Sequence, residues 1–164
     1  MKTLLLLALI FAANFSISQT IEISGNRLTF GKSFDEVKGN LWSNGGQIES
    51  DYSYIEFYEC NGQVDCINGA FYKNTLAAVY ISAHDNNSYP VSKDVENLLT
   101  GLEPFKEYTD FEDIGTDVQL YKTSDYYISR SSSRMNTDYI IIPIDILNNI
   151  QKQHPEYLKK FIDK

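Results

Sequence analysis

Two histidines, His84 and His154, are the first residues to weigh for chemistry, because histidine is the usual general base of enzymes. His84 begins a polar run over residues 84–87 that offers oxygen and nitrogen ligands to a metal. A metal site needs three or four converging ligands, and the chain has neither a His-x-x-x-His pair nor a paired-cysteine motif. His154 stands before Pro155, which is typical of a helix boundary. We therefore predict a solvated turn at His84, a helix end at His154 and no metal site.

Four carboxylates, at Asp110, Glu112, Asp113 and Asp117, form an acidic cluster. Hard cations such as Ca²⁺ take oxygen ligands of this kind. The spacing lacks the glycine and the final glutamate of an EF-hand loop, so the pattern favours a solvated acidic loop, with calcium binding as the alternative.

Two arginines, Arg130 and Arg134, flank a run of serines. Two guanidinium groups and several hydroxyls could bind an anion, so both arginines are candidate binding residues. The plainer alternative is the tip of a polar hairpin over residues 131–137. No Gly-x-Ser-x-Gly elbow, phosphate-binding loop or dinucleotide fingerprint is present, and we predict no cofactor and no catalytic residue.

The N-terminal segment predicts the compartment. Lys2 precedes an apolar run over residues 4–13, and the small-x-small motif of a cleavage site ends at Ser18. The run is shorter than the roughly 20 residues that a membrane-spanning helix needs. We predict a signal peptide over residues 1–18, with an uncleaved anchor as the alternative. Residues 19–164 then form a single exported domain, in the periplasm or outside the cell.

The two cysteines, Cys60 and Cys66, are predicted to form a disulfide, because an exported chain with an even cysteine count meets an oxidising environment. Asn61-Gly62 between them favours a turn. A bridge over so short a loop contributes only about 2 kcal/mol in the chain-entropy model. A catalytic thiol is the alternative, and it would need a neighbouring base.

Composition restricts the partners. The chain carries 14 basic and 22 acidic side chains and a net charge of −8, which becomes −9 once Lys2 is removed. This charge opposes phosphate backbones and anionic lipid, so we predict neither a nucleic-acid partner nor stable membrane insertion after cleavage.

The residue pattern predicts elements that would position these groups. Ser33 and Glu36 form a capping box at the start of a helix that carries Trp42 on its apolar side. Alternation with a period of two follows over residues 48–82 and indicates consecutive strands. A second helix is predicted at residues 93–100, followed by an irregular segment over residues 103–117. Three more strands are predicted at residues 118–122, 125–130 and 139–142, and a third helix from residue 144 onward. The fold class is therefore α+β, an antiparallel meander sheet with two to three helices packed on one face.

One predicted strand carries a row of tyrosines. Ile55 and Phe57 occupy one face, and the other face holds the set Tyr52, Tyr54, Glu56 and Tyr58. If the apolar face meets the helices, the tyrosines face outward as a rigid amphipathic contact surface. The alternative is that the C-terminal half covers them.

Two motifs resemble a known family. Residues 28–37 are similar to the "G-x-[ST]-x-x-E-V" helix opening of small bacterial envelope domains, and residues 71–76 resemble their "F-x-x-(turn)-L" hairpin. The family is the SmpA/OmlA type, with the β-lactamase inhibitor protein as a structural relative. The resemblance, over residues 28–81, implies helices on an antiparallel sheet and a habit of binding proteins, and it assigns no functional residue.

These patterns together predict an exported, non-catalytic interaction protein of the bacterial envelope whose partner is another protein. One alternative is an inhibitor or immunity protein against a secreted enzyme, because an acidic face can cover a basic cleft. The other is a small hydrolase that uses carboxylates or a metal.

Overall fold

The computed structural model describes the chain over residues 19–38, 48–52, 55–58, 66–84, 90–110, 116–133 and 136–155. These residues form a two-stranded hairpin, an eight-stranded antiparallel sheet and three helices, so the predicted α+β class with an antiparallel sheet is confirmed. The hairpin and the first half of the sheet comprise β1 (Thr20–Ile23), β2 (Asn26–Thr29), β3 (Ile48–Tyr52), β4 (Ile55–Tyr58), β5 (Cys66–Tyr72) and β6 (Thr75–His84). The second half comprises β7 (Lys106–Asp110), β8 (Thr116–Lys122), β9 (Tyr126–Ser132) and β10 (Asn136–Pro143). The helices are α2 (Phe34–Val37), α3 (Pro90–Leu99) and α4 (Ile144–Gln153). No helix in the described ranges is long and apolar enough to cross a membrane.

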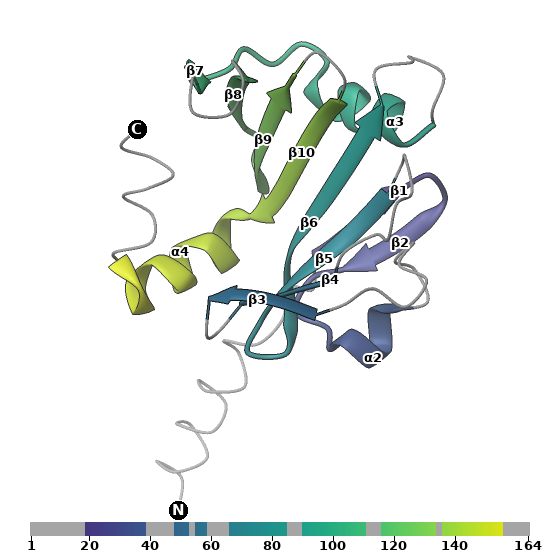
Figure 1. Ribbon diagram of the computed structural model, residues 1–164, viewed down its shortest axis with the longest axis vertical. Helices are drawn as coiled ribbons and strands as arrows, with labels where there is room; N and C mark the ends of the chain where they lie inside the picture. The colour runs from purple at the N-terminus through teal and green to yellow at the C-terminus, as the bar shows by residue number, and fades with distance from the viewer. Residues whose placement is uncertain are drawn as a thin grey trace, which may run out of the picture.

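The large sheet joins two runs of neighbouring strands. Its order is β3-β4-β5-β6-β10-β9-β8-β7, so each half follows the chain, and the two halves meet where β6 pairs with β10 (Figure 1). In that pairing Tyr139 lies opposite Ile81, and Ile141 lies opposite Val79. The strand order departs from a simple meander at this point, because β7 lies at the far edge rather than beside β6.

The β1–β2 hairpin resolves an ambiguity of the sequence, which allowed either one bent strand or a hairpin. Ser24 and Gly25 form the turn with φ values of 51° and 76°. Positive φ at both central residues matches the twist of the flanking strands. The Ser24 amide also donates to Asp94 Oδ2 at 2.8 Å, which fixes the turn to α3.

The capping box of α2 is confirmed. The Ser33 amide donates to Glu36 Oε2 at 2.9 Å, and Lys32 Nζ lies 3.0 Å from Glu36 Oε1. Phe34 packs against the core, and Val37 is buried. The predicted continuation of this helix through Trp42 lies outside the described residues.

The capping box predicts a specific acid response. The hydrogen bond from the Ser33 amide, followed by contacts from Lys32 and the Ser33 hydroxyl, lowers the pKa of Glu36 from 4.5 to about 2. A carboxyl whose folded pKa is lowered stabilises the fold above its unfolded pKa, and that stabilisation is lost as the pH falls through the folded pKa. We expect the Glu36 carboxyl signal in an NMR titration to move with a midpoint near 2. A midpoint near 4.5 would contradict the capping box.

A bulge in β6 decides which residues enter the core. Ala70 pairs with Ala78 but Phe71 pairs with Leu76, so Ala77 is an extra residue in β6. One extra residue reverses the alternation of side chains along a strand. Leu76 therefore shares a face with Phe71 and Val79, whereas Ala77 packs with Tyr72 on the other face.

The sheet consequently packs on both faces. On the core face, strand residues pack with the β1–β2 hairpin, α2 and α3 in one cluster that includes Ile67, Phe71, Val79, Ile81, Ile128, Tyr139 and Ile141. On the opposite face, here called the α4 face, Ile150 of α4 packs with Tyr72 and Ala77. Figure 1 shows α4 continuing directly from the end of β10. Helices α2 and α3 thus pack on the core face, whereas α4 packs against both clusters through Ile146 and against the second also through Ile150.

Several predicted boundaries shift. Helix α3 begins at Pro90, three residues before the predicted start at residue 93. Val95 and Leu99 are buried as predicted, but Leu98 is 40% exposed. Gly101 follows the helix with a φ of 79°, as its position after the last turn requires.

The C-terminal strands are longer than predicted. Strand β9 continues through Ser132, so the polar residues at 131 and 132 belong to the sheet and not to a loop. The segment predicted to be irregular contains β7, an edge strand in which Tyr108 pairs with Val118.

Candidate functional site

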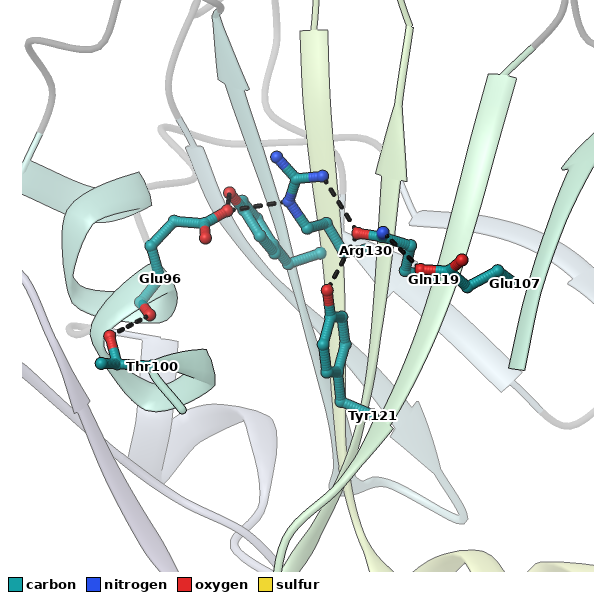
Figure 2. Close-up of polar contacts among 7 residues, drawn as sticks. Glu96, Thr100, Glu107, Gln119, Tyr121 and Arg130 are labelled. Carbon is teal, nitrogen blue, oxygen red and sulfur yellow. Dashed lines mark hydrogen bonds and ion pairs between the residues drawn. The ribbon is translucent and has the colours of Figure 1, made fainter. Parts of the chain in front are cut away.

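The densest set of polar contacts among the described residues joins α3 to β8, β9 and β10 on the core face. Glu96 Oε1 accepts from Tyr139 Oη at 2.6 Å and from Arg130 Nε at 2.8 Å. Arg130 also donates to Gln119 Oε1 at 3.3 Å, and Tyr121 donates to the same oxygen at 2.9 Å. Figure 2 shows the chain of contacts running from α3 across the strands, where Gln119 Nε2 donates to Glu107 Oε1 at 2.8 Å.

Strand register explains this convergence. Tyr139, Arg130, Gln119 and Glu107 are paired in one row across four neighbouring strands, so their side chains share a face. Glu96 lies on α3 one residue after the buried Val95 and closes the row at its α3 end.

Burial and charge set the protonation states of this row. Burial raises the pKa of Tyr139, and the hydrogen bond to the Glu96 carboxylate raises it further, against an opposing effect of Arg130. Burial alone would lower the pKa of the Arg130 guanidinium, but the hydrogen bond and charge of Glu96 outweigh it and the pKa is raised. Burial also raises the pKa of Tyr121. The tyrosines are therefore neutral hydrogen-bond donors at neutral pH, and Arg130 is a cation.

The contacts of this row link α3 to the sheet. Tyr139 is only 2% exposed, and a buried hydroxyl needs the acceptor that Glu96 supplies. The Arg130 guanidinium pairs with the Glu96 carboxylate. Arg130 itself lies within β9 and not at the tip of a hairpin. Arg134 lies outside the described residues, so anion binding by Arg130 and Arg134 together stays a prediction.

The α4 face presents a different kind of surface on its β7–β10 half. Phe105 is 55% exposed and Ile140 is 38% exposed, both large apolar side chains. The Phe105 and Tyr127 rings lie edge to face, with centroids 6.1 Å apart and an interplanar angle of 68°. We call the set Phe105, Tyr108, Tyr127, Ile140, Lys106 and Lys122 the aromatic strip.

Two lysines lie over tyrosine rings of the aromatic strip. Lys122 Nζ lies 5.2 Å from the centroid of Tyr127, and Lys106 Nζ lies 5.7 Å from the centroid of Tyr108. In contacts of this kind the negative face of the aromatic ring attracts the ammonium group. The aromatic strip therefore offers apolar area together with positive charge, on a chain whose net charge is −8.

Register places the aromatic strip on one face. Lys122 pairs with Tyr127, and Tyr127 pairs with Ile142. In the next row Lys106 pairs with Leu120, and Ser129 pairs with Ile140. Paired residues on antiparallel strands point to the same side, which is the side opposite the core cluster. Sequence reasoning missed this surface because its residues come from four separate segments, although the alternation of Lys106 and Tyr108 with Glu107 and Thr109 was a signal for β7.

The predicted tyrosine row falls at the other end of the sheet. Glu56 and Tyr58 lie in β4, where Glu56 pairs with Phe71 and Tyr58 pairs with Ile48. Tyr52 pairs with Ile55. The side chains of these residues, and Tyr54 as a whole, lie outside the described part of the structure, so the outward tyrosine row stays a prediction.

The disulfide also stays a prediction. Cys66 is the first residue of β5, opposite Ser82, and Cys60 lies outside the described residues. We expect the intact mass of the exported protein to rise by two hydrogens on reduction. Loss of the bridge should lower the free energy of unfolding by about 2 kcal/mol without unfolding the chain. Two free thiols in protein taken from its native compartment would contradict the prediction.

The other candidate ligands are dispersed. His84 is the last residue of β6 and not part of a loop, whereas His154 follows the last residue of α4 and contacts Tyr72 Oη at 3.1 Å, as a helix-boundary residue should. Asp117 accepts from Thr109 Oγ1 at 2.9 Å, and Glu112 and Asp113 lie outside the described residues. Among the residues that the structure describes, no group of three or more His, Cys, Asp or Glu side chains is arranged to hold a metal.

Comparison with known protein families, with curated proteins and with solved structures finds no match for this chain.

Proposed function

We propose that this chain is an exported, non-catalytic binding protein whose partner is another protein. Residues 19–164 act as a single domain once the signal peptide is removed, in the periplasm or outside the cell. The observation that carries the proposal is the aromatic strip, which leaves Phe105 and Ile140 exposed beside two tyrosine rings. Large apolar side chains grouped on one exposed face are typical of contact surfaces between proteins.

The chemistry of the aromatic strip favours a protein over other partners. Tyrosine and phenylalanine provide large contact area with few rotatable bonds, so little conformational entropy is lost on binding. The Lys122 ammonium group would pair with a carboxylate of the partner, which gives orientation and specificity. A partner surface with apolar side chains and acidic residues at its rim fits both requirements.

Photo-crosslinking tests the proposal. A photoreactive phenylalanine analogue at position 105 should form a defined adduct in the native envelope. The same analogue at position 98 is the matched control, because Leu98 is similarly exposed, at 40%, on α3. We expect the adduct from position 105 and not from position 98, and we expect Tyr127→Ser to remove it without lowering the melting temperature. Equal labelling from both positions, or none from position 105, would contradict the proposal.

A further inference from the structure

The N-terminal residue of the mature chain has a reactive combination of groups. Cleavage after Ser18 leaves Gln19 with a free α-amine whose nitrogen is four bonds from its own side-chain amide carbon, Cδ, through Cα, Cβ and Cγ. We infer that the mature protein carries a pyroglutamate at residue 19. The α-amine nitrogen attacks the Cδ carbon, the Cδ–Nε2 bond breaks, and Nε2 leaves as ammonia. A five-membered lactam remains, and no oxidant, reductant or other reactant is needed. This inference rests on the export that the proposed function includes.

The structure fixes Gln19 at the start of the fold. Its carbonyl oxygen accepts from the Phe30 amide at 2.9 Å, which extends the β1–β2 ladder by one step. The carbonyl oxygen of the next residue, Thr20, accepts from Tyr126 Oη at 3.4 Å, and the Phe30 and Tyr126 rings lie 5.9 Å apart. The first residue of the predicted mature chain is therefore held against the edge of the core and does not trail into solvent.

The surroundings of the Gln19 side chain favour a neutral group. Gln19 is half-buried, and its Oε1 atom is buried with no hydrogen-bond partner among the described residues. A half-buried terminal ammonium costs more free energy than a neutral amide, because burial disfavours a charge more strongly than a neutral polar group. Lactam formation removes the positive charge and two amide N–H donors while keeping the carbonyl group. The lactam thus has fewer polar groups that need hydrogen-bond partners, at a residue whose Oε1 atom has none among the described residues.

A tryptic digest of the full chain, recovered from the exported fraction of its native cells, tests the inference. Residues 19–27 form one tryptic peptide, because the next cleavage site is Arg27. We expect this peptide to begin at residue 19, to weigh less by one ammonia than the unmodified sequence, and to resist an aminopeptidase. A free α-amine on Gln19, or a first residue other than Gln19, would overturn the inference.

The Gln19→Asn variant is the matched control. Asparagine is one methylene shorter, so the same closure would need a strained four-membered ring, and we expect a free α-amine at residue 19. A blocked terminus in this variant would assign the block to another modification and also overturn the inference. The variant should still crosslink through position 105, since the aromatic strip lies on other elements. Loss of that crosslink in the unsubstituted chain would count against the proposed function alone.

Discussion

Replacing Phe71 with alanine should lower the free energy of unfolding by about 3–5 kcal/mol, the usual cost of removing a buried phenylalanine side chain. Phe71 is fully buried and packs edge to face against Phe34 of α2, with ring centroids 5.6 Å apart. It also lies opposite Leu76 at the β6 bulge, so its loss would leave a cavity between a helix and two strands. Urea denaturation followed by circular dichroism measures the change.

The conservative variant Phe71→Leu provides the control for this prediction. It keeps most of the apolar volume and should cost about 1–2 kcal/mol, because size-matched apolar changes are tolerated better than truncation. If the alanine variant unfolded at the same urea concentration as the unsubstituted protein, Phe71 could not be the contact between α2 and the sheet.

Gly69→Val should destabilise the protein by about 3 kcal/mol through overpacking. A Cβ atom built on Gly69 would lie 2.6 Å from Cε2 of Phe71 and 2.9 Å from Cδ1 of Leu76. Both neighbours are fully buried, so neither can move away without disturbing the core. Thermal and urea unfolding of the purified variant measure the loss.

A double variant separates crowding from any other effect of the valine. Phe71→Leu removes the ring atoms that meet the new Cβ, so combining it with Gly69→Val should cost less than the sum of the two single changes. The difference is the coupling that residues in contact show in a double-mutant cycle. If the destabilisation of the double variant equalled the sum of the two single variants to within about 0.5 kcal/mol, the Phe71 ring would not be the group that excludes a side chain at position 69.

Local features of the fold could be predicted from sequence because their causes are local. The capping box needs only Ser33 and Glu36, three residues apart, and it forms as expected. The turn between β5 and β6 falls at Lys73 and Asn74, and both residues have positive φ. Alternation over two residues also located β5 and β6, since it reports which side chains face the core.

Non-local features escaped prediction for physical reasons. The bulge at Ala77 reverses the alternation of β6, and no residue type there signals an extra position. The bulge turns Ala77 to the opposite face, where Ala77 and Tyr72 pack with Ile150 of α4. The pairing of β6 with β10 joins residues more than fifty positions apart, and their apolar pattern does not specify which strand is the partner.

The candidate site was harder to predict than the fold. Arg130 was recognised as a candidate, but the partner that neutralises it is Glu96, thirty-four positions away on a different element. The aromatic strip is assembled by register across β7, β8, β9 and β10, so it exists only after the strands have paired. A single segment of sequence carries only one or two of its members.

The joint between the two halves of the sheet has a consequence for the order in which the chain folds. Strands β3 to β6 can pair through short connections, as can β7 to β10, whereas the β6–β10 ladder needs a long loop to close and so carries the larger entropic cost. Until β10 pairs with it, β6 is an edge strand of an incomplete sheet, and its backbone N–H and C=O groups near Val79 and Ile81 have no strand partner on that side. Such an edge can pair with the same strand of another copy. In the export that we propose, the N-terminal half of the chain would leave the secretion pore first, and β6 would stay exposed until β10 follows.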